Sequence, residues 1–482
     1  MSLSGTLMNA FSGLRATSRG AAIVSTNIAN ATTESYGRRS LALSSDSIGS
    51  IGGVRVDGVV RHTDAALISD RRVSDSSLGW ANDLLSFANR LEEGVGETGT
   101  PGALTDLVTV FENTLLTGAA NPASTQRLES IATAANDLAG KLNQLSNLVQ
   151  EERVNADSAI AAQVRTLNET MASLEELNND LVKAGTTGAD ISPMLDERAR
   201  LLDSVSDIVP LRIVPRENNT IAVYTQGGAV LLDGKPFEIG FSESNTISPY
   251  MTLAAGDLSG LTLDGIPVSS RNGGQLAGGT LGAAFELRDD IAVQRQAQLD
   301  GIARDLIERF EPGGPDTTLA VGDPGLFTDE GLAFDPTEEV GIAQRIELND
   351  LVAPGGGGTW RLRDGLGALT QGEVGDATLL TAITAALEEK VLPSSATLDP
   401  VSSSFMNQVA NFASDVVGER VRAENRHIFA LSQNTGLKEV ELSKGVDTDF
   451  ELQNLMEIEQ LYAANAKVMQ TVDELLARLM NI

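Results

Sequence analysis

The sequence predicts a mainly α-helical fold with an inserted β-rich domain, in an elongated chain of several domains. Three observations support this prediction. Apolar residues recur with helical spacing at both ends of the chain, and the stretch between Lys141 and Ala184 contains neither proline nor glycine. Short apolar runs separated by turn residues lie between residues 206 and 274. Since both ends are helical, the economical architecture is a rod whose helical stem is built from the two ends of the chain.

Each end of the chain carries one apolar stripe. Spacings of three and four residues place each stripe on one face of a helix, at the period that drives helices to pair. The first stripe, with Phe11 beside it, consists of Leu3, Leu7, Ala10, Leu14, Thr17, Ala21, Val24 and Ile28. The second consists of Leu455, Ile458, Tyr462, Asn465, Met469, Val472, Leu475, Leu476 and Leu479.

These two helices predict a partner, because a lone amphipathic helix of this length is marginal in water. The partner is the other end of the chain, another copy, or both. Charge favours the first: residues 1–40 contain four arginines and one acid, whereas residues 449–482 contain six acids and two basic residues. The alternative is an ordinary helical domain, whose core-facing helices show a similar stripe.

Composition narrows the classes of function. A net charge of −31 argues against nucleic acid or an anionic membrane as a partner, because both require a basic face. The absence of cysteine excludes disulfides, thiolate catalysis and cysteine metal sites. The N-terminal residues do not fit a cleaved secretory signal, and no stretch approaches the ~20 apolar residues of a membrane span. The chain therefore reads as cytoplasmic, or as exported by a route without a cleaved signal.

The first half of the chain is expected to be almost entirely helical. A turn-rich stretch with a short strand around Val54–Val59 separates the N-terminal helix from helices over Asp64–Leu91 and Ala103–Leu116. Pro122 then opens one or two helices of about 60 residues in all, or ~90 Å if continuous. Their two heptad frames, offset by one residue, are Leu128, Ile131, Ala135, Leu138, Leu142, Leu145 and Val149, then Ile160, Val164, Leu167, Met171, Leu174, Asn178 and Leu181.

The pattern changes at Pro210. Apolar residues on both sides of Glu217-Asn218-Asn219 predict a hairpin, and runs that end in Asp233-Gly234 and Asp264-Gly265 predict strands that enter turns. Later helices are expected over Leu281–Phe310, from Asp376 onward, over Ser402–Ser432 and, after a loop from Asn434 to Asp449, to the end of the chain.

These boundaries divide the chain into three discontinuous domains. They are a terminal coiled-coil domain of residues 1–32 and 450–482, a helical rod domain of residues 33–205, 275–310 and 376–449, and a β-rich outer domain of residues 206–274 and 311–375.

The sequence gives no positive sign of an enzyme. His62 and His427 are far apart, and His427 lies on a charged helix face. Gly355–Gly358 lacks the Lys-Ser/Thr that would make a phosphate loop, and Asp289-Asp290 is not spaced as a calcium loop. Two carboxylates that meet in space could act as a glycosidase pair, but nothing indicates it. We therefore expect no catalytic residues, no cofactor and no metal.

Two motifs resemble the bacterial flagellar rod, hook and hook-associated proteins. At the N-terminus a leucine-striped helix runs into Asn27-Ile-Ala-Asn30, followed by Thr33 and Tyr36. The family places Pro-Gly between the threonine and the tyrosine, whereas this chain has Glu34-Ser35, which does not enforce a turn. At the C-terminus, Leu461-Tyr-Ala-Ala-Asn-Ala-Lys-Val468 resembles the matching family helix.

Further segments resemble the hook-associated protein 1 subfamily, whose members join hook to filament. They are Asn121-Pro122, Leu195-Asp196-Glu197-Arg198 and Gly273–Asp289. The resemblance covers residues 1–240, 275–310 and 400–482, and residues 311–400 remain unmatched. Another axial flagellar protein, such as a hook or rod protein or a flagellin, is the nearest alternative. A coiled-coil signalling protein or adhesin, and a wall-acting enzyme on an axial scaffold, are more distant ones.

The resemblance implies a structural role. Family members leave the cell unfolded through the flagellar type III export channel, and their terminal helices form a coaxial coiled-coil tube on assembly. It implies as partners other copies of the chain, the hook protein, the second junction protein and an export chaperone that holds the C-terminal helix, with no nucleic acid and no membrane. The expected assembly residues are Leu3, Leu7, Phe11, Leu14, Val24, Asn27, Ile28 and Asn30 in the N-terminal helix. In the C-terminal helix, which by the same resemblance is also expected to bind the chaperone, they are Leu455, Ile458, Tyr462, Asn465, Val468, Met469, Val472, Leu475, Leu476 and Leu479.

Overall fold

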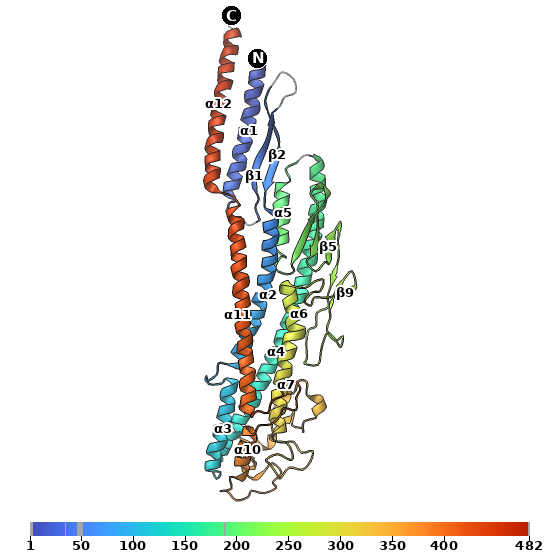
Figure 1. Cartoon of the computed structure of the whole chain (residues 1–482), viewed down its shortest axis with the longest axis vertical. Coiled ribbons are helices and arrows are strands. Elements are labelled where there is room, and N and C mark those ends of the chain that lie inside the picture. The colour runs from blue at the N-terminus through green and yellow to red at the C-terminus, as the bar shows by residue number, and fades with distance from the viewer. Residues whose placement is uncertain (1–2, 34, 46–51, 188, 481–482) are drawn as a thin grey trace.

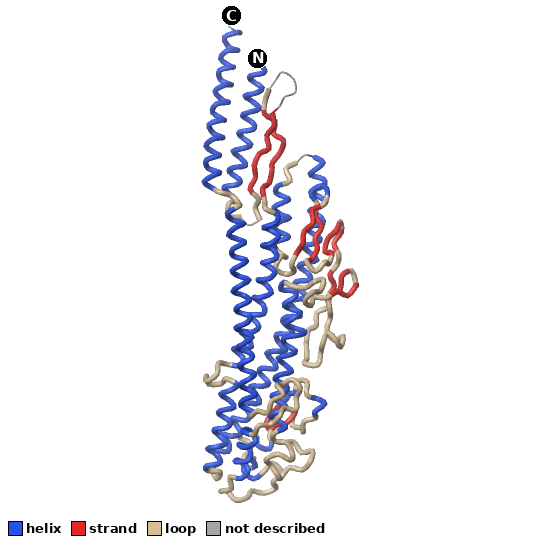
Figure 2. Tube along the Cα trace, in the orientation of Figure 1, coloured by secondary structure: helices blue, strands red, loops and turns tan. Residues whose placement is uncertain are grey.

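The computed structural model is an elongated molecule in which both ends of the chain lie at one tip (Figure 1). It describes residues 3–33, 35–45, 52–187 and 189–480, so Glu34 of the N-terminal motif lies outside the described residues. Long helices dominate, and the strands form small sheets on one side (Figure 2). The predicted fold class, mainly α with an inserted β-rich part, is confirmed.

One unbroken helix, α4 (Thr125–Thr187), is the axis of the rod. It is 63 residues long, or about 95 Å at 1.5 Å per residue. Every residue of the two predicted heptad frames is buried, and the shift of frame by one residue lets the apolar face follow its neighbours along the rod. Of the one or two helices expected here, the structure contains one, and the expected length is confirmed.

The long helices α2 (Ala65–Val95) and α11 (Phe405–Ser443) run side by side, and α2 also packs against α4 (Figure 1). Asp64 caps the start of α2 by accepting a hydrogen bond from the Leu67 amide at 3.1 Å. Shorter helices complete this region: α3 (Leu104–Ala120), α5 (Ser192–Asp203), α6 (Gly279–Glu286), a π-helical turn η2 (Leu287–Ile291) and α7 (Ala292–Glu308).

The predicted loop from Asn434 to Asp449 is wrong over most of its length, since α11 continues to Ser443. The reason is a tertiary contact that overrides the local turn signal of Asn434-Thr-Gly436. Asn434 is only 2% exposed, and its Nδ2 donates to Asp75 Oδ1 of α2 at 2.7 Å. Two turns later, Glu441 pairs with Arg71 Nε at 2.9 Å. The helix is therefore held against α2 beyond the glycine.

Two small antiparallel sheets pack on the upper part of α4. The first has the order β3 (Leu211–Pro215), β4 (Ile221–Thr225), β5 (Val230–Asp233), β6 (Lys235–Pro236), and the second has β7 (Ile239–Gly240), β8 (Leu261–Leu263), β9 (Ile266–Val268). The predicted turns are confirmed: Asn218 and Asn219 of η1 (Glu217–Asn219), and Asp264 with Gly265, all have positive φ.

Asparagines of α4 attach both sheets to the helix. Asn168 donates to Ile239 O at 2.8 Å and accepts from Ile239 N at 2.9 Å. Asn178 makes the same pair of bonds with Ile221, at 3.0 and 3.1 Å. Each amide side chain thus forms the donor and acceptor pair that a neighbouring strand would form. It fixes the first residue of β4 or β7 on the surface of α4.

The far end of the rod is an irregular cap. It contains α10 (Thr378–Glu388) and the short elements β10 (Phe327–Asp329), η3 (Pro336–Glu338), α8 (Ile342–Arg345), β11 (Ile346–Leu348), η4 (Asp350–Val352) and α9 (Arg361–Asp364). Asn143 of α4 donates to Ala343 O and Ile346 O here. Asn143 precedes Asn168 by 25 positions, or about 37 Å. Residues 311–375 therefore lie at a different level of the rod from strands β3 to β9.

A buried arginine ties the second sheet region to the rod. Arg288, in the π-helical turn, is 0% exposed and pairs with Asp157 Oδ1 of α4 at 2.5 Å and with Asp289 at 2.8 Å. Its Nη2 also donates to Ser259 O at 3.0 Å. Arg153 donates to Ser248 O and Met251 O, so two buried guanidinium groups satisfy the carbonyls of this loop.

We expect Arg288→Leu to lower the free energy of unfolding by about 3–5 kcal/mol, because it leaves the buried carboxylate of Asp157 without its cation. Arg271→Leu is the matched control, since Arg271 pairs with Asp290 at the surface and such pairs contribute about 0–1 kcal/mol. Urea denaturation followed by circular dichroism measures both. Equal losses in the two variants would contradict the assignment.

Candidate assembly interface

The two ends of the chain form an antiparallel helix pair with close backbones. Helix α1 (Leu3–Ala29) packs against α12 (Thr448–Met480) at the tip of the molecule (Figure 2). The contact face of α1 is made of small residues. A Cβ on Gly13 would lie 2.9 Å from the Asn465 side chain, and one on Gly20 would lie 3.2 Å from Ile458 Cδ1. This face lets the helices approach closely and leaves bulkier side chains at its margins.

The structure distributes the predicted N-terminal residues over three environments. Val24 and Asn27 are buried. Phe11 is 55% exposed, as is its neighbour Met8 at 58%. The remaining predicted residues are partly buried, and they are Leu3, Leu7, Leu14, Ile28 and Asn30.

The predicted C-terminal residues divide in the same way. Val472 is buried. Those that lie half-buried beside α1 are Leu455, Ile458, Asn465 and Met469. Those that remain 37–60% exposed are Tyr462, Val468, Leu475, Leu476 and Leu479.

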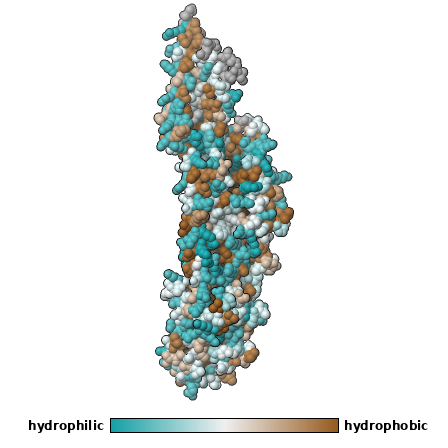
Figure 3. Space-filling model, viewed as in Figure 1, coloured by the Kyte–Doolittle hydropathy of each residue, from teal (hydrophilic) through white to brown (hydrophobic). Residues whose placement is uncertain are grey.

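Helix α12 carries a second apolar stripe that α1 does not cover. Leu461, Val468 and Leu475 recur every seven residues, and they are 50%, 41% and 46% exposed. Leu479 extends this stripe at 60% exposure. Figure 3 shows apolar side chains that reach the surface over the terminal helices. A heptad stripe beside an occupied seam is the pattern of a helix that packs against more than one neighbour.

A hairpin lies along α1 and closes this end of the molecule. Strand β1 (Arg38–Ser45) pairs antiparallel with β2 (Val54–His62). Asn27 joins α1 to β1, since its Nδ2 donates to Arg39 O at 2.8 Å and its Oδ1 accepts from Arg39 N at 3.0 Å. The Tyr36 hydroxyl donates to the same Oδ1 at 2.8 Å, and burial raises the pKa of Tyr36.

An ionic joint, formed by residues of the hairpin, α2, α5, α11 and α12, connects the tip to the rod. Arg38 pairs with Glu451 at 2.8 Å, and Glu451 is 0% exposed. Asp203 accepts from Arg71 at 2.6 Å and from Arg72 at 2.7 Å. Burial alone would raise the pKa of Asp203, but the two guanidinium groups outweigh it and hold that pKa below its usual value.

Sequence reasoning missed this joint. Asp196 also belongs to the joint, because its carboxylate accepts from the Gly37 amide and from Arg61 Nε. It lies in the Leu195–Arg198 segment that carried part of the family resemblance. No pattern along the chain indicates these partners, which lie more than 130 residues away. The short spacing between acids and arginines on α2 and α5 was the only signal, and it is equally typical of a solvated helix face.

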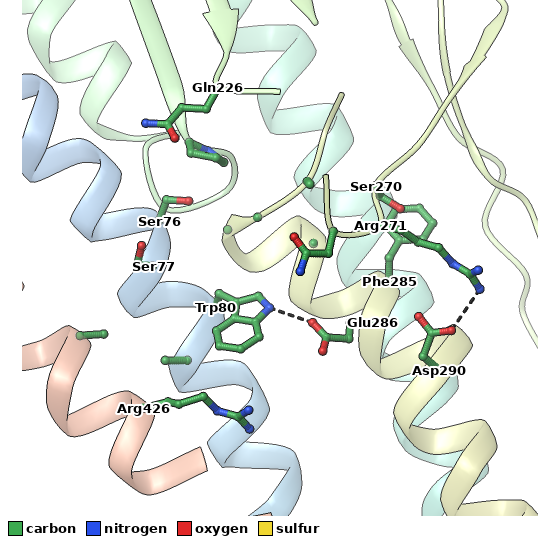
Figure 4. Close-up of a pocket in the computed structure, with 18 of the residues that line it drawn as sticks. Ser76, Ser77, Trp80, Gln226, Ser270, Arg271, Phe285, Glu286, Asp290 and Arg426 are labelled. Atoms are coloured by element: carbon green, nitrogen blue, oxygen red, sulfur yellow. Dashed lines mark hydrogen bonds and ion pairs between the residues drawn. The ribbon is translucent and has the colours of Figure 1, made fainter. Parts of the chain in front are cut away.

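An open cleft of about 1120 Å³ lies lower on the rod, between α2, α6 and α11 (Figure 4). Trp80 Nε1 donates to Glu286 at 3.0 Å, the guanidinium of Arg426 lies 5.4 Å from the Trp80 ring centre, and Arg271 pairs with Asp290. These charged groups are occupied with one another. Among the residues that the structure describes, no cluster of His, Asp and Glu is arranged to hold a metal ion.

Across the described ranges, no helix combines the length and the apolar character that a membrane span requires.

Two flagellar family models match parts of the chain. The model of the helical domain of the flagellar hook-associated protein FlgK matches residues 88–312, and that of the C-terminal region of the flagellar basal body rod proteins FlgEFG matches residues 443–482. Together the two matches cover more than half of the chain.

Relatives that align with the chain from end to end are flagellar hook-associated proteins 1. Flagellar hook-associated protein 1 of Bacillus subtilis is 21% identical over 99% of both chains, and that of Escherichia coli is 23% identical over 100% of both. The solved structure of the flagellar hook junction protein FlgK from Burkholderia pseudomallei aligns over 54% of this chain and 46% of its own, with 19% identity and a TM-score of 0.42.

The matched domains, in the order in which they occur, and the relatives that match from end to end therefore lead to one conclusion. The chain belongs to the flagellar hook-associated protein 1 family, and it is a structural component of the bacterial flagellum.

Proposed function

We propose that this structural component of the hook–filament junction assembles through α1 and α12 into a layer of copies, after export through the flagellar type III channel without a cleaved signal. The observation that carries the proposal is the uncovered stripe of Leu461, Val468, Leu475 and Leu479 on α12. Contacts with the hook protein and the second junction protein follow from a place in the layer between them. No catalytic step is part of this function.

Apolar burial supplies the driving force. The four stripe residues are 41–60% exposed, and covering the exposed half of each contributes roughly 1 kcal/mol per side chain. Met8 and Phe11 on the outer face of α1 add two more. A copy that joins the layer must order its terminal helices, and this gain offsets the conformational entropy that is lost.

Charge favours contact between α1 of one copy and α12 of another. The described part of α1 contains Arg15 and Arg19 and no acid, whereas α12 exposes Glu457, Glu459 and Glu474. Like charges would oppose a contact between two α12 helices. The arrangement supported best places α1 of one copy beside α12 of the next, which is a heterologous contact that can close into a ring.

In the free chain we expect residues 3–29 and 450–480 to exchange amide hydrogens much faster than the rod, because the pair is held by one narrow face of small residues. Hydrogen-exchange mass spectrometry on the purified monomer gives the comparison, with the buried centre of α4 as the internal reference. Protection of both ends equal to that of α4 would mean that the pair is already a stable core, which would contradict ordering on assembly.

We predict that Leu7→Asp or Leu476→Asp abolishes incorporation into flagella, because each puts a charge on an apolar contact, while the rod remains folded. Gln470→Asp is the matched control, since Gln470 is an exposed residue of α12 on the side opposite the stripe. Swimming in soft agar and immunoblots of purified hook–filament structures provide the measurements. The proposal fails if both leucine variants occupy the junction at the wild-type level.

We further propose that the export chaperone binds α12 before export, since this helix offers apolar surface on two sides. Deletion of residues 452–482 should reduce chaperone affinity at least ~100-fold, because a helix-in-groove contact is lost as a unit. Calorimetry with the purified chaperone measures it, and deletion of residues 3–29 serves as the control. Unchanged affinity after the C-terminal deletion would refute this part.

A further inference from the structure

We infer that Asp196 of α5 is a positioning residue that clamps the β1–β2 hairpin onto the rod and so sets the direction in which the terminal helices leave it. Its carboxylate accepts three hydrogen bonds from the hairpin and its approach. Oδ1 accepts from the Gly37 amide at 3.1 Å and from Arg61 Nε at 2.7 Å, and Oδ2 accepts from Arg39 Nη2.

The two arginines require this carboxylate. Arg39 on β1 and Arg61 on β2 are directly opposite one another in the strand register. Like charges at such a position destabilise a hairpin. Their side chains are only 13% and 12% exposed, so water screens them poorly. One carboxylate that binds both guanidinium groups converts a repulsive pair into a bridge between the strands and α5.

Two further contacts of these arginines are with neutral groups, since Arg61 Nη2 donates to Ser35 O at 2.9 Å and the Arg39 guanidinium lies 5.0 Å from the Tyr36 ring centre. Arg198, two residues after Asp196, is also cationic, and burial together with the charges of Arg61 and Arg72 lowers its pKa to about 10. Asp203, the next acid along α5 toward the joint, is already engaged by Arg71 and Arg72. Asp196 is therefore the carboxylate that pairs with Arg39 and Arg61.

Gly37 fits the clamp sterically. A Cβ at this position would lie 2.3 Å from Arg61 Nε, so any larger residue would push Arg61 away from Asp196. Arg39 is fixed from the other side by Asn27, which bonds both its amide and its carbonyl. A continuous path of hydrogen bonds thus runs from α1 through β1 to α5. This path is independent of the contact between α1 and α12.

This path gives the hairpin a role in assembly, and that role rests on the proposed function. When the terminal helices are disordered, the clamped hairpin is still in place and presents the surface on which α1 docks. The clamp itself does not depend on what the terminal helices bind.

The test uses the full chain, whose lack of native cysteine allows two spin labels to be placed at will. We choose Leu43→Cys, 53% exposed on β1, and Ser173→Cys, exposed on α4. Electron–electron double resonance should give one narrow distance distribution. Asp196→Asn should broaden it, and amides of β1 and β2 should exchange ~10-fold faster, as expected for loss of hydrogen bonds to a charged group.

Glu197→Gln is the matched control, because it removes one exposed acid from the same turn of α5, and it should leave the distribution narrow. Gly37→Ala disrupts the clamp from the hairpin side by displacing Arg61. It should broaden the distance distribution as Asp196→Asn does, without a change in the rod. Circular dichroism verifies that each variant keeps its helices.

The inference is overturned if Asp196→Asn stays as narrow as Glu197→Gln, or if the unsubstituted labelled chain is already broad. Neither result bears on whether Leu476→Asp blocks incorporation, so failure of the clamp and failure of the proposed assembly are distinguishable.

Discussion

The length and continuity of α4 set the geometry on which the rest of the structure depends. Its 63 residues carry a buried apolar face along the rod, and α2, α3, α6, α7 and both sheets pack directly on it. Three asparagines make these attachments explicit: Asn143 binds the cap, Asn168 the second sheet and Asn178 the first. A break in this helix would remove the common reference that aligns sheets, cap and the α2–α11 pair.

The molecule uses different chemistry along its length. The rod is held by apolar burial supplemented by buried guanidinium groups such as Arg288, which satisfy loop carbonyls that water cannot reach. The joint is ionic and directional, with Asp196 and Asp203 each shared between two arginines. The tip is a narrow contact of small residues flanked by exposed apolar side chains. Stability is thus concentrated in the rod, orientation in the joint, and capacity for association in the tip.

Much of this could be predicted from the sequence, because periodicity and turn chemistry are local. The heptad frames of α4, the Asn218-Asn219 hairpin and the helical ends all follow from residues close in the chain. The end of α11 could not be predicted, since Asn434 is kept helical by Asp75, which lies 359 positions earlier. The ionic joint was missed for the same reason. In α1, the predicted stripe omits Gly13 and Gly20, which lie against Asn465 and Ile458 of α12, because glycine gives no signal in a hydrophobic pattern.

The position of the two chain ends has a practical consequence for imaging. Both termini lie at the tip, so a fluorescent protein fused to either end would crowd the surface through which copies meet (Figure 1). The cap at the opposite end offers a better site. Gly355 and Gly357 adopt left-handed backbone conformations in an exposed turn near the start of α4, where an inserted epitope would interrupt neither helix nor strand. A label there would report on the assembled particle without taking part in its construction.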